Sequence, residues 1–198
     1  MKKLLATSIL TAAFSSNGFS QDMHTQHGAH EHGAANLNIV QENDQIMISL
    51  ETPAMNILGF EHAPSTEEHV TTIHNAKTQL LNANALFEFN KKANCQFVEA
   101  NIESELFDNE AHHEDEHEDQ HEDEHEDEHE DEHEDEHESH NDIDVIWSFQ
   151  CKKPKKLTEL TVNLAQFFPS FIDIDAQYIL QQSQGVIELS AKDNVIKF

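Results

Sequence analysis

The segment HHEDEHEDQHEDEHEDEHEDEHEDEHESH, residues 112–140, constrains the fold more than any other feature of the chain. A histidine stands at every fourth position from His113 to His137, and acidic residues fill almost every position between them. Such a stretch has too little apolar surface to offset the entropy lost on folding, so we expect it to be disordered without metal. The hydrophobic core must therefore come from the two flanking parts of the chain.

The histidines of this tract are suited to binding metal. Neutral imidazole is a common ligand of divalent transition metals, and carboxylates add oxygen ligands. Histidines four residues apart lie on one face of a helix, although the column drifts by about 40° per repeat, so only neighbours can share an ion. A donor set without cysteine favours zinc, with nickel, cobalt and copper(II) as competitors. The candidate ligands in the tract are His112, His113, His117, His121, His125, His129, His133, His137 and His140.

Two other interpretations of the tract compete with metal binding. An acidic run is usually a solvated tail, but nine histidines in 29 positions are not explained in that way. A pH sensor is the second alternative, because protonating all 16 histidines would move the formal net charge from −28 to −12. Metal binding remains the main prediction.

The first 20 residues, MKKLLATSILTAAFSSNGFS, are typical of a secretory signal peptide. Two lysines precede an apolar run, and small residues precede a possible cleavage site before Gln21. The run is shorter than the roughly 20 residues that cross a bilayer. We therefore expect a soluble exported protein, in the periplasm of a Gram-negative bacterium or, alternatively, in the medium.

Charge and cysteine usage narrow the class further. All 11 basic residues are lysines and the net charge is −28, which argues against a nucleic-acid or anionic-membrane partner. The only cysteines, Cys95 and Cys151, flank the tract. In an oxidising compartment they are expected to form one disulfide that staples the base of the tract. The alternative is two free thiols that join a metal site.

Alternating apolar residues predict a β-hairpin over 37–50, with its turn at Asn43 and Asp44. A loop bounded by Pro53 and Pro64 is expected next. An N-capping serine and helical spacing of apolar residues predict one amphipathic helix over 66–85.

On either side of the tract, residues 95–107 and 142–151 alternate again and could pair as an antiparallel hairpin with the tract as its tip. Three further alternating runs, a turn and a short helix are predicted towards the C-terminus: runs 157–164, 172–180 and 186–189, a turn at Gln184-Gly185, and a helical turn over 165–168 that ends at Pro169.

These elements predict an α+β fold, mostly antiparallel β-sheet with one amphipathic helix packed on it and a long disordered loop. The expected organisation is a signal peptide (1–20), a flexible His-rich arm (21–33) and one metal-binding domain (34–198) interrupted by the loop 109–141. Trp147 and the phenylalanines are expected in the core.

Several histidines outside the tract are also candidate ligands. His30 and His32 could reach one ion from the arm, and His62, beside Glu61, could join them in a folded site. His69 and His74 fall on the predicted helix, but a spacing of five residues does not align them well.

The segments HEHGAANLNIV and ETPAMNILGFEHAP, followed by the His/Asp/Glu tract, resemble the ZrgA family of periplasmic zinc-binding proteins over the whole mature chain. The resemblance implies a protein that assists high-affinity zinc uptake, with the substrate-binding protein of a ZnuABC-type importer as partner. His30, His32, Glu61 and His62 are carried over as positions of the family motif.

The leading hypothesis is thus a zinc-binding accessory protein or metallochaperone that works by ligand exchange. A storage or detoxification buffer for zinc, nickel or copper is the alternative. We expect no enzyme: HEDEH repeats the letters of a zinc hydrolase motif, but within a segment that offers no pocket.

Overall fold

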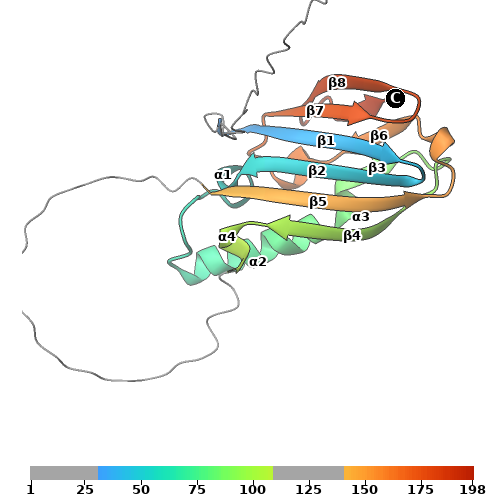
Figure 1. Ribbon diagram of the computed structural model, residues 1–198. Coiled ribbons are helices and arrows are strands. Elements are labelled where there is room, and N and C mark those ends of the chain that lie inside the picture. The colour runs from blue at the N-terminus through green and yellow to red at the C-terminus, as the bar shows by residue number, and fades with distance from the viewer. Residues whose placement is uncertain (1–30, 109–140) are drawn as a thin grey trace, which may run out of the picture.

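The computed structural model describes residues 31–108 and 141–198, which form a six-stranded sheet, a three-stranded sheet and short helices (Figure 1). The predicted signal peptide, His30 and the nine tract histidines lie outside the described residues. The strands are β1 (Ala34–Glu42), β2 (Gln45–Pro53), β3 (Phe87–Phe89), β4 (Cys95–Glu103), β5 (Asp142–Cys151), β6 (Glu159–Val162), β7 (Asp173–Ile179), β8 (Gln184–Leu189) and β9 (Val195–Lys197). The helices are α1 (Ala54–Leu58), α2 (Glu67–Leu81), α3 (Ala83–Leu86), α4 (Glu105–Asp108) and α5 (Leu164–Phe167), with a 3₁₀ turn η2 (Pro154–Lys156).

The large sheet has the order β4-β5-β2-β1-β7-β8, and the small sheet has the order β3-β6-β9. β1 and β2 form the predicted hairpin, and Asn43 takes the left-handed conformation (φ 56°) that its tight turn needs. All pairings are antiparallel except that of β1 with β7. The α+β prediction is confirmed; the parallel pair and the second sheet were not predicted.

β4 and β5 form the predicted hairpin around the tract. Cys95 is paired with Cys151 at one end of this ladder, and the two are joined by the expected disulfide. Glu103 is paired with Asp144 at the other end, close to the described residues that flank the tract. The expectation that the disulfide staples the base of the tract was therefore wrong. The disulfide lies at the end of the β4–β5 ladder opposite to Glu103 and Asp144.

The core lies between one face of the large sheet and a layer made by α2 and the small sheet (Figure 1). Ile73, Ala76 and Leu80 line the buried face of α2. Trp147 of β5 is fully buried, and its Nε1–H donates to the carbonyl of Leu80 (2.7 Å), so even the polar atom of this core residue is satisfied. The prediction that Trp147 belongs to the core is confirmed.

Three local predictions were wrong. Residues 54–58 of the expected loop form helix α1. The long helix ends at Leu81, because Asn82 leaves helical geometry (φ −84°, ψ 57°), and a separate short helix, α3, then leads to β3. Gln184 and Gly185 lie inside strand β8 rather than in a turn.

None of the helices in the described residues is long and apolar enough to cross a membrane.

Candidate metal-binding site at the base of the tract

The described residues on both sides of the tract are fixed to the folded domain. On the incoming side, Leu106 and Phe107 of α4 are buried in the core, with relative exposures of 2% and 3%. On the outgoing side, the carbonyl of Asn141 accepts the N–H of Ala54 (2.8 Å). The described residues that precede and follow the tract therefore lie at one corner of the domain.

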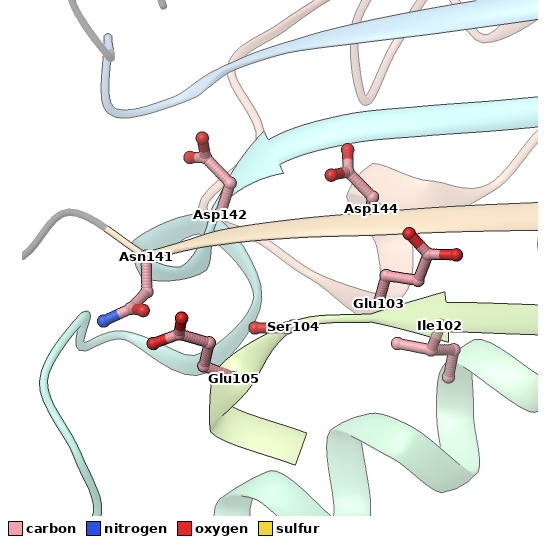
Figure 2. A pocket seen from close by; sticks show the side chains of 7 residues that line it. All are labelled: Ile102, Glu103, Ser104, Glu105, Asn141, Asp142 and Asp144. Atoms are coloured by element: carbon pink, nitrogen blue, oxygen red, sulfur yellow. The ribbon is translucent and has the colours of Figure 1, made fainter. Parts of the chain in front are cut away.

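An acidic pocket of about 530 Å³ lies between these two ends (Figure 2). Glu103, Glu105, Asp142 and Asp144 contribute carboxylates to its lining, and Asn141 stands beside them. Carboxylates gathered in a concave surface attract cations and raise their local concentration. The corner where the tract begins and ends is thus itself strongly negative.

This acidic character continues across the outer face of the large sheet. The cross-strand partners form one row that runs through all six strands in sheet order: Glu103, Asp144, Glu51, Asn36, Asp175 and Glu188. All six side chains are exposed. Like charges directly opposite each other destabilise a sheet, so this row is not explained by the stability of the fold.

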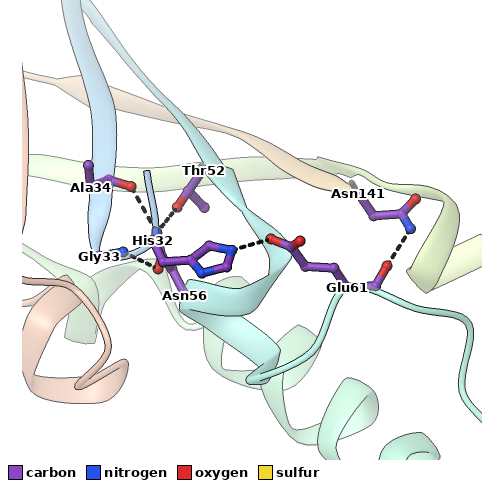
Figure 3. A network of polar contacts seen from close by, with 7 residues as sticks. All are labelled: His32, Gly33, Ala34, Thr52, Asn56, Glu61 and Asn141. Carbon is purple, nitrogen blue, oxygen red and sulfur yellow. Dashed lines mark hydrogen bonds and ion pairs between the residues drawn. The ribbon is translucent and has the colours of Figure 1, made fainter. Parts of the chain in front are cut away.

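A buried network next to the same corner fixes the start of β1 (Figure 3). Asn56 of α1 is only 2% exposed, accepts the N–H of Gly33 (2.7 Å) and donates to the carbonyl of Ala34 (2.8 Å) and to Thr52 Oγ1 (3.0 Å). Gly33 has φ 95°, a backbone conformation that residues with a Cβ atom rarely adopt. The glycine of the HEHG segment is therefore required by the backbone.

This anchoring places His32 against Glu61. His32 Nε2 lies 3.3 Å from Glu61 Oε1; the His32 side chain is 55% exposed and that of Glu61 is 13% exposed. Asn141 Nδ2 donates to the carbonyl of Glu61 (2.5 Å), so the Glu61 loop contacts the residue that follows the tract (Figure 3). Three segments far apart in the sequence meet here.

A second histidine contact involves His62, the residue after Glu61. Phe60 stacks on His62 (ring centres 5.3 Å apart) and on His69 (4.4 Å). The rings of His62 and His69 are 5.1 Å apart and tilted by 53°. His69 lies in the first turn of α2, where its N–H donates to the N-capping Thr66 Oγ1 (3.2 Å).

The structure therefore brings His32 to Glu61, and His62 to His69. Within residues 31–108 and 141–198, no group of three or more His, Cys, Asp or Glu side chains is arranged to hold a metal ion. Sequence reasoning missed the proximity of His69, because it compared His69 with His74 along the helix. The short connection between His62 and the N-terminus of the helix was the available signal.

Residues 29–198 match the model of a family described as ZrgA family zinc uptake protein. The match covers the described residues together with the tract. No curated protein matches the chain.

Proposed function

The chain belongs to the ZrgA family of zinc uptake proteins, and we propose that it is a periplasmic zinc-binding accessory protein or metallochaperone. In this role, the tract captures zinc and the folded corner beside it receives the ion. Zinc passes by exchange between ligands, with no covalent chemistry. The protein is not proposed to be an enzyme.

The observation that carries this proposal is the convergence at the tract base. The chain leaves the fold at α4 and returns at Asn141, whose side chain contacts the Glu61 loop. His32, Glu61 and His62, which the family resemblance singles out, therefore lie close to Asn141, the first described residue after the histidine-rich segment. An ion released by the tract would meet these side chains first.

The acidic surface supports the same role. The pocket carboxylates and the acidic row extend the negative field of the tract over the corner and the sheet. Cations are attracted by this field, and anionic competitors are repelled. Zinc is the proposed cargo, and nickel, cobalt and copper(II) are the metals expected to compete for imidazole ligands.

The proposed recipient is the substrate-binding protein of a ZnuABC-type ABC importer. A storage or detoxification buffer is the second candidate, which the high number of tract histidines favours. Gene expression separates the two roles. Induction by zinc starvation supports uptake, and induction by metal excess supports buffering.

The first experiment is calorimetric zinc titration of the mature protein and of a variant lacking residues 112–140, with nickel and copper(II) as competitors. The deletion is designed from the geometry, since both ends of the tract are held by the domain at one corner. We expect most bound ions to be lost and one zinc-preferring site to remain. Loss of all binding in a folded variant would instead support the simple buffer.

A further inference from the structure

His62 and His69 form a pair of imidazoles whose first member directly follows Glu61 in the sequence. We infer that this pair is a two-imidazole zinc site, in which Nε2 of each ring binds the ion and water completes the coordination. The inference rests on the proposed function and specifies two ligands within it. His69 belongs to no motif that the sequence resemblance identifies.

The spacing of the rings fits a shared ion. Their centres are 5.1 Å apart and their planes are tilted by 53°, so they are not stacked on each other. In a tetrahedral zinc site each Zn–N bond is about 2.0–2.1 Å and each ring centre lies about 1.1 Å beyond its nitrogen, which puts two imidazole centres roughly 5 Å apart. The folded chain therefore holds the rings at the separation that zinc requires.

The hydrogen bonds place the ring proton on different nitrogens in the two histidines. His62 Nδ1 lies 2.9 Å from the carbonyl of Ala63 and donates to it, which leaves the lone pair on Nε2. His69 Nδ1 accepts the N–H of Ser65 (3.3 Å), so the neutral ring carries its proton on Nε2, and Ser65 Oγ lies 3.5 Å from the same Nδ1. Zinc binding through His69 Nε2 therefore requires the ring proton to move from Nε2 to Nδ1, which can then donate a hydrogen bond to Ser65 Oγ. Within the described residues, neither Nε2 has a hydrogen-bond partner.

Phe60 limits the freedom of both rings before any ion arrives. It is buried (8% exposed) and stacks on both imidazoles. His69 is further fixed because its backbone belongs to the capped first turn of α2. Restricting ligand side chains in advance lowers the entropy lost on binding.

The local charge also favours a cation. The N-terminus of a helix carries partial positive charge, which alone would repel zinc. Glu67 and Glu68 occupy the first turn of α2 and offset it, and Glu61 precedes His62 in the loop. His62 is exposed and His69 is partly exposed, so an ion can enter and leave the pair.

The test is site-resolved and uses the full chain. Histidines are modified with diethyl pyrocarbonate at increasing zinc concentrations, and the modification rate at each position is read by mass spectrometry. Total bound zinc is measured in parallel by equilibrium dialysis. The variants are His62→Ala, His69→Ala and His69→Gln, with His74→Ala as a matched control on the exposed face of the same helix.

We expect zinc to slow modification of His62 and His69 with one shared midpoint and to leave His74 unchanged. Losing one imidazole should raise the zinc concentration needed to protect the other. The increase should be at least roughly 10- to 100-fold, which is the loss of affinity when a residue that only supports a metal ligand is removed. His69→Gln keeps the size of the side chain and should act like His69→Ala. His74→Ala should change nothing.

If zinc still protects His62 unchanged in both His69 variants, the two-imidazole site is disproved. His62 would then bind zinc together with ligands other than His69. Absence of zinc protection at both rings would also overturn it and leave only an aromatic stack. In either case, total bound zinc reports separately on the proposed function, which fails only if the full chain binds no zinc.

Discussion

At the scale of single residues, the corner depends on one buried asparagine and one glycine with positive φ. Asn56 satisfies the start of β1 and Thr52 at once, and Gly33 supplies a backbone geometry that other residues disfavour. The family motif pointed to His32, Glu61 and His62 as functional positions, but it did not show which contacts hold the neighbouring backbone in place. The reason lies in contacts between residues more than 20 positions apart, which no local pattern reports.

Asn56→Ala tests this anchoring. The substitution leaves the N–H of Gly33 and the carbonyl of Ala34 without their side-chain partners, and each buried unsatisfied group costs about 1–3 kcal/mol. We expect the free energy of unfolding in urea to fall by about 2–4 kcal/mol. Asn38→Ala, at an exposed position of β1, should change it by no more than about 0.5 kcal/mol. Equal effects of the two substitutions would show that the network is not stabilising.

At the scale of elements, local patterns predicted the two hairpins and the main helix, because alternation, turn residues and capping act over a few positions. They did not predict the parallel pairing of β1 with β7 or the three-stranded sheet, which join distant segments. The sequence predicts a turn at Gly185, because glycine favours turns. In the structure it leaves room for Tyr178 on the neighbouring strand, where a Cβ would lie 2.6 Å from the Tyr178 hydroxyl.

The acidic row gives an element-scale prediction. Glu51 lies directly opposite Asp144 on the outer face of the sheet. Glu51→Gln removes this like-charge contact and should raise the free energy of unfolding by about 0.2–1 kcal/mol at low ionic strength. The gain should shrink in 0.5 M salt, since screening weakens the repulsion that is removed. A gain that is independent of salt would show that packing, not charge, is responsible.

The disulfide gives a second prediction at this scale. Cys95 and Cys151 are separated by 56 residues in the sequence, and the closed loop contains the tract. A cross-link over such a loop stabilises by about 4 kcal/mol in the chain-entropy model. The Cys95→Ala, Cys151→Ala double variant should unfold at correspondingly lower urea concentration. Reductant should lower the midpoint of the wild type and leave that of the variant unchanged; a shift in the variant would point to another cause.

At the scale of the whole molecule, charge is distributed unevenly between the two ends. The acidic pocket, Glu61 and the described residues that flank the tract lie at one end of β5. Six of the 11 lysines lie at the other end, because the loop carrying Lys91 and Lys92 is hydrogen-bonded to the one carrying Lys152 and Lys153, with Lys155 and Lys156 just beyond. The composition predicts the net charge of the protein. The separation of acidic groups from lysines at opposite ends of β5 can be seen only in the folded structure.

Zinc-dependent unfolding distinguishes the folded site from the tract. A ligand stabilises a protein only if it binds the native state more tightly than the unfolded state, by about 2.7 kcal/mol when its concentration is 100 times the dissociation constant. Zinc bound only through tract histidines should shift the urea midpoint little. Zinc bound by His62 and His69 should raise it, and the double alanine variant should lose the rise. Calcium, which prefers oxygen ligands, serves as the control metal.

The parallel pairing of β1 with β7 has a consequence for the order in which the molecule can form. Residue 34 is paired with residue 173, so the centre of the large sheet cannot be completed until almost the entire chain is available. Pairings between such distant segments are slow to form, because the cost of loop closure comes before the contacts that offset it. The nascent chain thus remains without its complete central sheet until its last quarter has been synthesised.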